Sequence, residues 1–71
     1  MTMPTVLLNG ESTALPEGAT AADAVRATGV AENGRGVAVA LDGQVVPRAE
    51  WTDTELPEGG HVEVLRAVQG G

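Results

Sequence analysis

The last three residues of this 71-residue chain, Gln69, Gly70 and Gly71, carry its most unusual chemical group, a terminal carboxylate on two residues without side chains. Because glycine has no Cβ, it enters backbone conformations that are closed to other residues and passes through channels too narrow for a side chain. The Gly71 carboxylate is therefore unhindered. Chain termini are also often frayed, so the glycine pair gains meaning only if the rest of the chain offers no other chemistry.

The other reactive side chains do not form a recognisable catalytic set. The chain has one histidine, His61, and one serine, Ser12, and we interpret His61 as an exposed residue at the start of a strand. Four carboxylates fall in segments with loop composition, where a solvated surface is the expected environment: Glu50, Asp53, Glu55 and Glu58. A metal would have only oxygen ligands and one imidazole, without a known loop spacing, so we expect no metal site and no catalytic residue.

The composition of the chain excludes several further classes of function. Ten acidic residues against four arginines give a net charge of −6, which repels nucleic acid. Such a surface either favours a basic protein partner or serves solubility. The absence of cysteine excludes disulfides and a thiolate nucleophile. No apolar run reaches the ~20 residues of a membrane span, and no signal peptide is visible, so we expect a cytoplasmic protein.

The first half of the chain predicts a β-hairpin and a helix. Residues 5–8 read as a strand, Asn9-Gly10 is a strong hairpin signal, and residues 11–14 can return antiparallel. Thr20 followed by Asp23 resembles a capping box, which predicts a helix from Ala21 to about Thr28, before Gly29.

The second half predicts another hairpin and a final strand. Residues 37–41 and 44–46 flank Asp42-Gly43, and a short 3₁₀ segment after Pro47 should place Trp51 in the core. The last strand begins at His61. We expect the helix to pack on one sheet face through six residues: Val25, Val39, Leu41, Trp51, Val62 and Val64.

These elements predict an α+β fold, a mixed sheet of four to five strands with one main helix across one face. A β-grasp is the leading arrangement, in which the first and last strands lie side by side in the middle of the sheet. We expect one domain over residues 1–68 and a flexible diglycine tail over 69–71.

Three segments resemble the bacterial sulfur carrier proteins of thiamine (thiazole) biosynthesis, a family with the ubiquitin-like β-grasp fold. They are VAVALDGQVVPRAEW from Val37 to Trp51, VEVLRAVQGG from Val62 to Gly71, and LPEGAT from Leu15 to Thr20. The resemblance extends over nearly the whole chain. It implies a sulfur carrier that catalyses nothing itself and binds no cofactor.

In such carriers the terminal carboxylate, here that of Gly71, is adenylated by an activating enzyme of the ubiquitin-activating class, which consumes ATP. The acyl adenylate becomes a thiocarboxylate, with sulfur supplied indirectly by a cysteine desulfurase system, and thiazole synthase receives the sulfur. The resemblance also implies that Gly70 is required for activation.

For partner binding we expect the sheet face and the last strand, whose exposed members should be Glu63, Leu65 and Arg66, while Val62 and Val64 face the helix. Two other hypotheses stay open. One is a carrier of another pathway, such as the small subunit of molybdopterin synthase or a carrier for a specialised metabolite. The other is a β-grasp interaction module whose terminal glycines are incidental.

Overall fold

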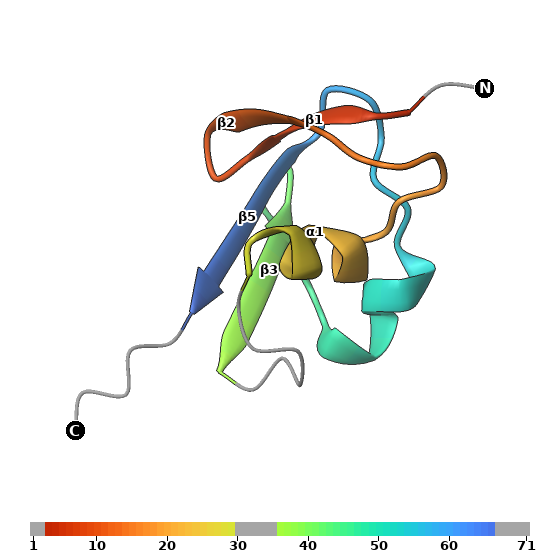
Figure 1. Ribbon diagram of the computed structural model, residues 1–71. Coiled ribbons are helices and arrows are strands. Elements are labelled where there is room, and N and C mark those ends of the chain that lie inside the picture. Colours follow the sequence, from red (N-terminus) through yellow and green to blue (C-terminus); the bar gives the residue numbers. More distant parts are fainter. Residues whose placement is uncertain (1–2, 30–35, 67–71) are drawn as a thin grey trace.

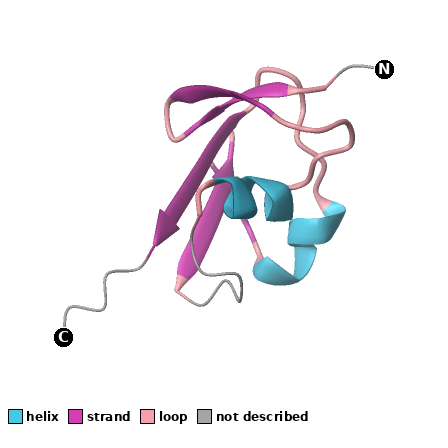
Figure 2. Ribbon diagram, viewed as in Figure 1, coloured by secondary structure: helices cyan, strands magenta, loops and turns pink. Residues whose placement is uncertain are grey.

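The computed structural model describes residues 3–29 and 36–66, which form one five-stranded sheet with a short α-helix across one face (Figures 1 and 2). The elements are β1 Thr5–Leu8, β2 Glu11–Ala14, α1 Ala21–Ala27, β3 Val37–Leu41, β4 Gln44–Val46, the 3₁₀ helix η1 Arg48–Asp53, and β5 His61–Arg66. Within these two ranges, no helix has the length and apolar character needed to cross a membrane.

The strand order β2-β1-β5-β3-β4 confirms the predicted mixed sheet and its β-grasp arrangement. β1 and β5 are parallel neighbours, paired at Leu7↔His61 and Leu8↔Val62. The pairs β1·β2, β3·β4 and β3·β5 are antiparallel. The first and last strands therefore lie side by side, with β5 in the middle of the sheet.

Both predicted hairpin turns are present. Asn9 and Gly10 have φ angles of 52° and 83°, and Asp42 and Gly43 have φ angles of 49° and 85°. Two successive residues with positive φ characterise the type I′ turn, whose twist matches that of the flanking strands. Asn and Asp tolerate the left-handed region better than most residues, which explains the Asn-Gly and Asp-Gly sequences.

Helix α1 begins where the capping box predicted. The backbone N–H of Thr20 donates a hydrogen bond of 2.8 Å to Oδ2 of Asp23, and Arg26 forms an ion pair with Oδ1 of the same carboxylate. The helix ends at Ala27, with Thr28 as its C-cap, and Gly29 then takes a φ of 76°. Only glycine adopts that φ without strain, so the chain turns away from the helix there.

The core lies between α1, η1 and one face of the sheet. Of the six residues predicted for it, five are buried: Val25, Val39, Trp51, Val62 and Val64. The sixth, Leu41, is partly buried and packs against the same cluster. The indole Nε1–H of Trp51 donates a hydrogen bond of 2.9 Å to the carbonyl of Val46, so the polar atom of the only aromatic side chain is satisfied inside the core.

The capping contact of Asp23 makes the stability of the fold depend on pH. The hydrogen bond from the Thr20 backbone, aided by Arg26, lowers the pKa of Asp23 against the opposing effect of its partial burial. A carboxyl whose pKa is lower in the folded state stabilises that state above its unfolded pKa, and this stabilisation is lost as pH falls through the folded pKa.

We therefore expect Asp23→Asn to lower the free energy of unfolding by about 1 kcal/mol near neutral pH. The difference from the parent should shrink as the pH falls below the pKa of an unfolded Asp and through the lower pKa of the folded Asp23, where the parent carboxyl also becomes neutral. Urea unfolding at several pH values measures this. Asp53→Asn removes the same charge from an exposed position at the end of η1. Equal behaviour of the two variants at every pH would contradict the capping role.

Candidate functional site

The strand that leads to the C-terminus is bonded along both of its edges. On one edge, β3 pairs with β5 from Leu41↔Val62 to Val37↔Arg66. On the other, the N–H of Leu7 donates to the carbonyl of Gly60 at 2.9 Å, and the N–H of Asn9 donates to the carbonyl of Val62 at 2.8 Å. Backbone hydrogen bonds therefore hold β5 on both edges at its start, and on the β3 edge they continue to Arg66.

Two turn side chains add hydrogen bonds to β5. Oδ1 of Asn9 accepts from the N–H of Val64 at 2.8 Å, and Nδ2 of Asn9 donates to the carbonyl of Val64 at 3.2 Å. Oδ1 of Asp42 accepts from the N–H of His61 at 2.9 Å. The sequence predicted both turns but not these contacts. The signal that could have suggested them is the residue type, because Asn and Asp combine a left-handed turn with a side chain that can hydrogen-bond to backbone.

Side chains along β5 alternate between two faces, as predicted. Val62 and Val64 are 0% and 5% exposed and face α1, whereas Leu65 is 60% exposed. Glu63 is also exposed. On the side away from α1, the sheet register places Glu63 opposite Ala40 and Leu65 opposite Ala38, and Ala40 opposite Val45 of β4. We call this surface the outer face and define it by five residues: Ala38, Ala40, Val45, Glu63 and Leu65.

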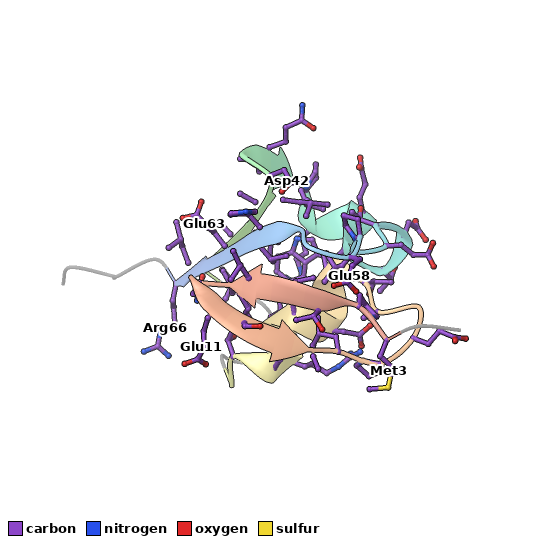
Figure 3. All side chains as sticks on the ribbon, turned by 90° about the horizontal axis from the view of Figure 1, so that it is seen from above. Met3, Glu11, Asp42, Glu58, Glu63 and Arg66 are labelled. Carbon is purple, nitrogen blue, oxygen red and sulfur yellow. The ribbon has the colours of Figure 1, made fainter. Side chains whose placement is uncertain are left out.

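Arg66 is exposed, as expected, but alternation along β5 puts it on the opposite side of the sheet from Glu63 and Leu65. Figure 3 shows Glu63 and Arg66 pointing in opposite directions, with Arg66 on the same side as Glu11. The three residues predicted for partner binding thus do not form one continuous surface. Glu63 and Leu65 share the outer face, and Arg66 stands at the end of β5 on the helix side.

The outer face is mostly apolar. Val45 is 74% exposed and has Ala40 as its register partner, while Leu65, 60% exposed, has Ala38. A shallow groove of about 330 Å³ extends from Glu63 toward the two hairpin turns, between Gly10 and Gly43. Exposed apolar side chains grouped on one sheet face, with a carboxylate among them, are typical of a protein-binding surface.

The two side chains considered for hydrolysis are not in contact range. Leu7 of β1 is the register partner of both Ser12 in β2 and His61 in β5. Two strand spacings therefore separate the backbones of Ser12 and His61, about 10 Å, with Leu7 between them. A nucleophile and its base need a hydrogen bond, so this pair does not form a catalytic dyad.

The loop carboxylates Glu50, Asp53, Glu55 and Glu58 are exposed, as expected. Across residues 3–29 and 36–66, no three His, Asp or Glu side chains gather in a way that could hold a metal ion.

Gly70 and Gly71, the predicted site of sulfur chemistry, lie outside the described residues, as does the predicted domain boundary between residues 68 and 69. What the structure contributes to that site is the strand that leads to it.

Comparison with known proteins decides the family. The model of the ThiS family matches residues 6–71, almost the whole chain, including both terminal glycines. The chain belongs to the ThiS family. This confirms the resemblance to the sulfur carriers of thiamine biosynthesis that the sequence motifs indicated.

A solved structure gives independent support for the fold. The crystal structure of a thiamine biosynthesis protein (ThiS) from Geobacter metallireducens superposes with a TM-score of 0.73 at 26% identity, covering 94% of this chain and 99% of that one. A search of curated proteins gives no match.

Replacement by serine should lower the free energy of unfolding by different amounts on the two faces of β5. Leu65→Ser should change the free energy of unfolding by no more than about 0.5 kcal/mol, because its side chain is already largely in water. Val64→Ser removes a buried apolar side chain and buries a hydroxyl, so it should cost about 2 kcal/mol or more. Thermal and urea unfolding measure both variants. Equal costs would contradict the assignment of the two faces.

Proposed function

We propose that this ThiS-family chain is a sulfur carrier for the thiazole of thiamine and that its active group is the carboxylate of Gly71. An activating enzyme of the ubiquitin-activating class would catalyse attack of a carboxylate oxygen on the α-phosphorus of ATP, with pyrophosphate leaving. The terminal sulfur of a persulfide, which comes ultimately from cysteine through a desulfurase system, would then displace AMP to give an acyl disulfide. A thiol reductant would cleave its S–S bond, which leaves the thiocarboxylate on the carrier and a disulfide as the oxidised product. Activation is required because a carboxylate is a poor electrophile, whereas the mixed anhydride has a good leaving group.

The observation that carries this proposal is the match to the family model, which runs through to Gly71. The similar Geobacter protein is a thiamine biosynthesis protein, which favours thiazole over other sulfur pathways. The thiazole synthase that receives the sulfur is the corresponding partner.

The chain acts in this scheme as a co-substrate and not as an enzyme. Sulfur held as a C-terminal thiocarboxylate needs no thiol of its own, and the sequence has no cysteine that could attack the adenylate within the same molecule. ATP belongs to the activating enzyme. The cytoplasmic location expected from the sequence remains a prediction.

The outer face is the surface that we propose for partner docking. Its apolar members Leu65 and Val45 fit an apolar patch on a partner, and the Glu63 carboxylate fits a nearby Arg or Lys of that partner. Since the chain carries a net charge of −6, a basic rim on the partner would also increase the association rate. Arg66, on the other side of β5, would contact a partner only where the partner encloses the end of the strand.

Replacing Glu63 and Leu65 together by Ser should weaken binding to both the activating enzyme and thiazole synthase by about tenfold or more, because both side chains are exposed and central to this face. The fold should remain intact, as checked by thermal unfolding. Binding is measured by calorimetry with each purified partner. Glu17→Ser, at an exposed position in the loop before α1, is the control. Unchanged affinity for both partners would exclude the outer face.

Gly70→Val tests the tail. A branched Cβ restricts the backbone and needs space next to the reacting carboxylate, and a displacement of about 1 Å at a reacting atom can cost on the order of 10²-fold in rate. The melting curve should match that of the parent. ATP–pyrophosphate exchange with the activating enzyme measures the rate, with Gly70→Ala and a chain lacking both glycines for comparison. Normal pyrophosphate exchange by the chain that lacks both glycines would contradict the carrier function. The intact mass of the protein purified from cells is a second test, and a mass that never shows one oxygen replaced by sulfur would also contradict it.

A further inference from the structure

Asn9 continues the pairing of β5 beyond the point where β1 ends. The register of β1 with β5 stops at Leu8↔Val62. The backbone N–H of Asn9 then donates to the carbonyl of Val62, and its side-chain amide bonds both the N–H and the carbonyl of Val64, at 2.8 and 3.2 Å. The side chain thus does what the next peptide group of β1 would do if the strand did not turn.

This contact matters because of where it lies on β5. Val64 is only two residues from Arg66, the last residue of the strand. On the β3 side, backbone pairing continues to Val37↔Arg66. On the β1 side, the hydrogen bonds to Val64 come from one side chain, which reaches across 55 positions of sequence. The pairing of the C-terminal part of β5 with the β1 side therefore depends on the Asn9 amide.

We propose that Asn9 is a positioning residue for sulfur transfer: its side-chain amide holds the end of β5 so that the chain leaves the sheet at a defined point and in a defined direction. This inference rests on the proposed function, in which Gly71 must reach the α-phosphate of ATP on a partner. If Val64 is released, more of the backbone must be ordered when the carrier docks. The position of the reacting carboxylate then becomes less well defined.

Two substitutions separate this role from the turn. Asn9 has a φ of 52°, which Gly adopts freely and Asp tolerates. Asn9→Gly keeps the turn and removes both side-chain hydrogen bonds. Asn9→Asp keeps an acceptor for the N–H of Val64 but replaces the donor with an oxygen that faces the Val64 carbonyl.

The second hairpin supplies a matched control. Asp42 has a φ of 49° in the same type of turn, and its side chain accepts a hydrogen bond from the N–H of His61, at the opposite end of β5. Asp42→Gly therefore removes a similar contact from the same strand, far from the C-terminus. Asn9→Gly loses two side-chain hydrogen bonds and Asp42→Gly loses one, so the two variants are compared at saturating carrier, where a difference in stability alone leaves kcat unchanged.

The readout is steady-state adenylation of the full-length carrier by the activating enzyme of the same organism, followed as ATP–pyrophosphate exchange. We expect Asn9→Gly to lower kcat by about tenfold or more relative to Asp42→Gly, with Asn9→Asp in between. A purely structural role would instead reduce the fraction of competent carrier, which raises the apparent KM and leaves kcat unchanged at saturation.

Amide hydrogen exchange shows whether each variant loses the intended contact. The Val64 amide should exchange about fivefold faster or more in Asn9→Gly, and the His61 amide in Asp42→Gly. Normal kcat in Asn9→Gly, together with fast exchange at Val64, would overturn the positioning role alone. A parent chain that supports no pyrophosphate exchange would overturn the proposed function and this inference with it. If Asn9→Gly does not fold, an unchanged kcat in Asn9→Asp is the overturning result.

Discussion

The parallel pairing of β1 with β5 is the constraint around which the rest of this structure is arranged. Parallel neighbours cannot be joined by a tight turn, so the chain between them must cross from one end of the sheet to the other. Here α1 makes part of that connection and packs on the sheet, and β3 and β4 complete the other edge of β5 (Figure 1). The result is that the strand leading to the C-terminus occupies the middle of the sheet.

A small core makes this arrangement depend on directional contacts. The buried cluster consists of Val, Leu and Ala with Trp51 as its only aromatic side chain, and a 71-residue chain buries a smaller fraction of its surface than a larger domain does. Hydrogen bonds that fix the register between strands then contribute more to selecting this fold over other strand pairings. The Asn9 and Asp42 contacts with β5 are of this kind, and the bond from the Trp51 indole to Val46 fixes the position of η1 against the end of β4.

The two faces of the sheet separate the residues that stabilise the fold from the residues that we propose for partner docking. Val62 and Val64 contribute to the core on the helix side, while Glu63 and Leu65 remain available on the outer face. Under this proposal, substitutions on the outer face alter partner choice without altering the fold. This separation suits a proposed carrier, because its reactive group is a backbone carboxylate and its folded body serves to present that group to more than one partner.

The sequence by itself determined the local elements, because each depends on neighbouring residues. Asn9-Gly10 and Asp42-Gly43 specify type I′ turns through their φ preferences, Thr20 and Asp23 specify the start of α1, and period-two alternation separates Val62 and Val64 from Glu63 and Leu65. The motifs that resemble sulfur carriers were also readable in the sequence, and the family match confirms them.

Only the tertiary structure decided which distant groups meet. The Asn9 amide and the Val64 backbone are 55 positions apart, and their contact exists only because β1 and β5 are parallel neighbours in one particular register. The same register puts Leu7 between Ser12 and His61, and the twofold alternation along β5 sends Arg66 to the side opposite Glu63. Local propensity carries no information on register between distant strands, since register is set by the burial of one whole sheet face.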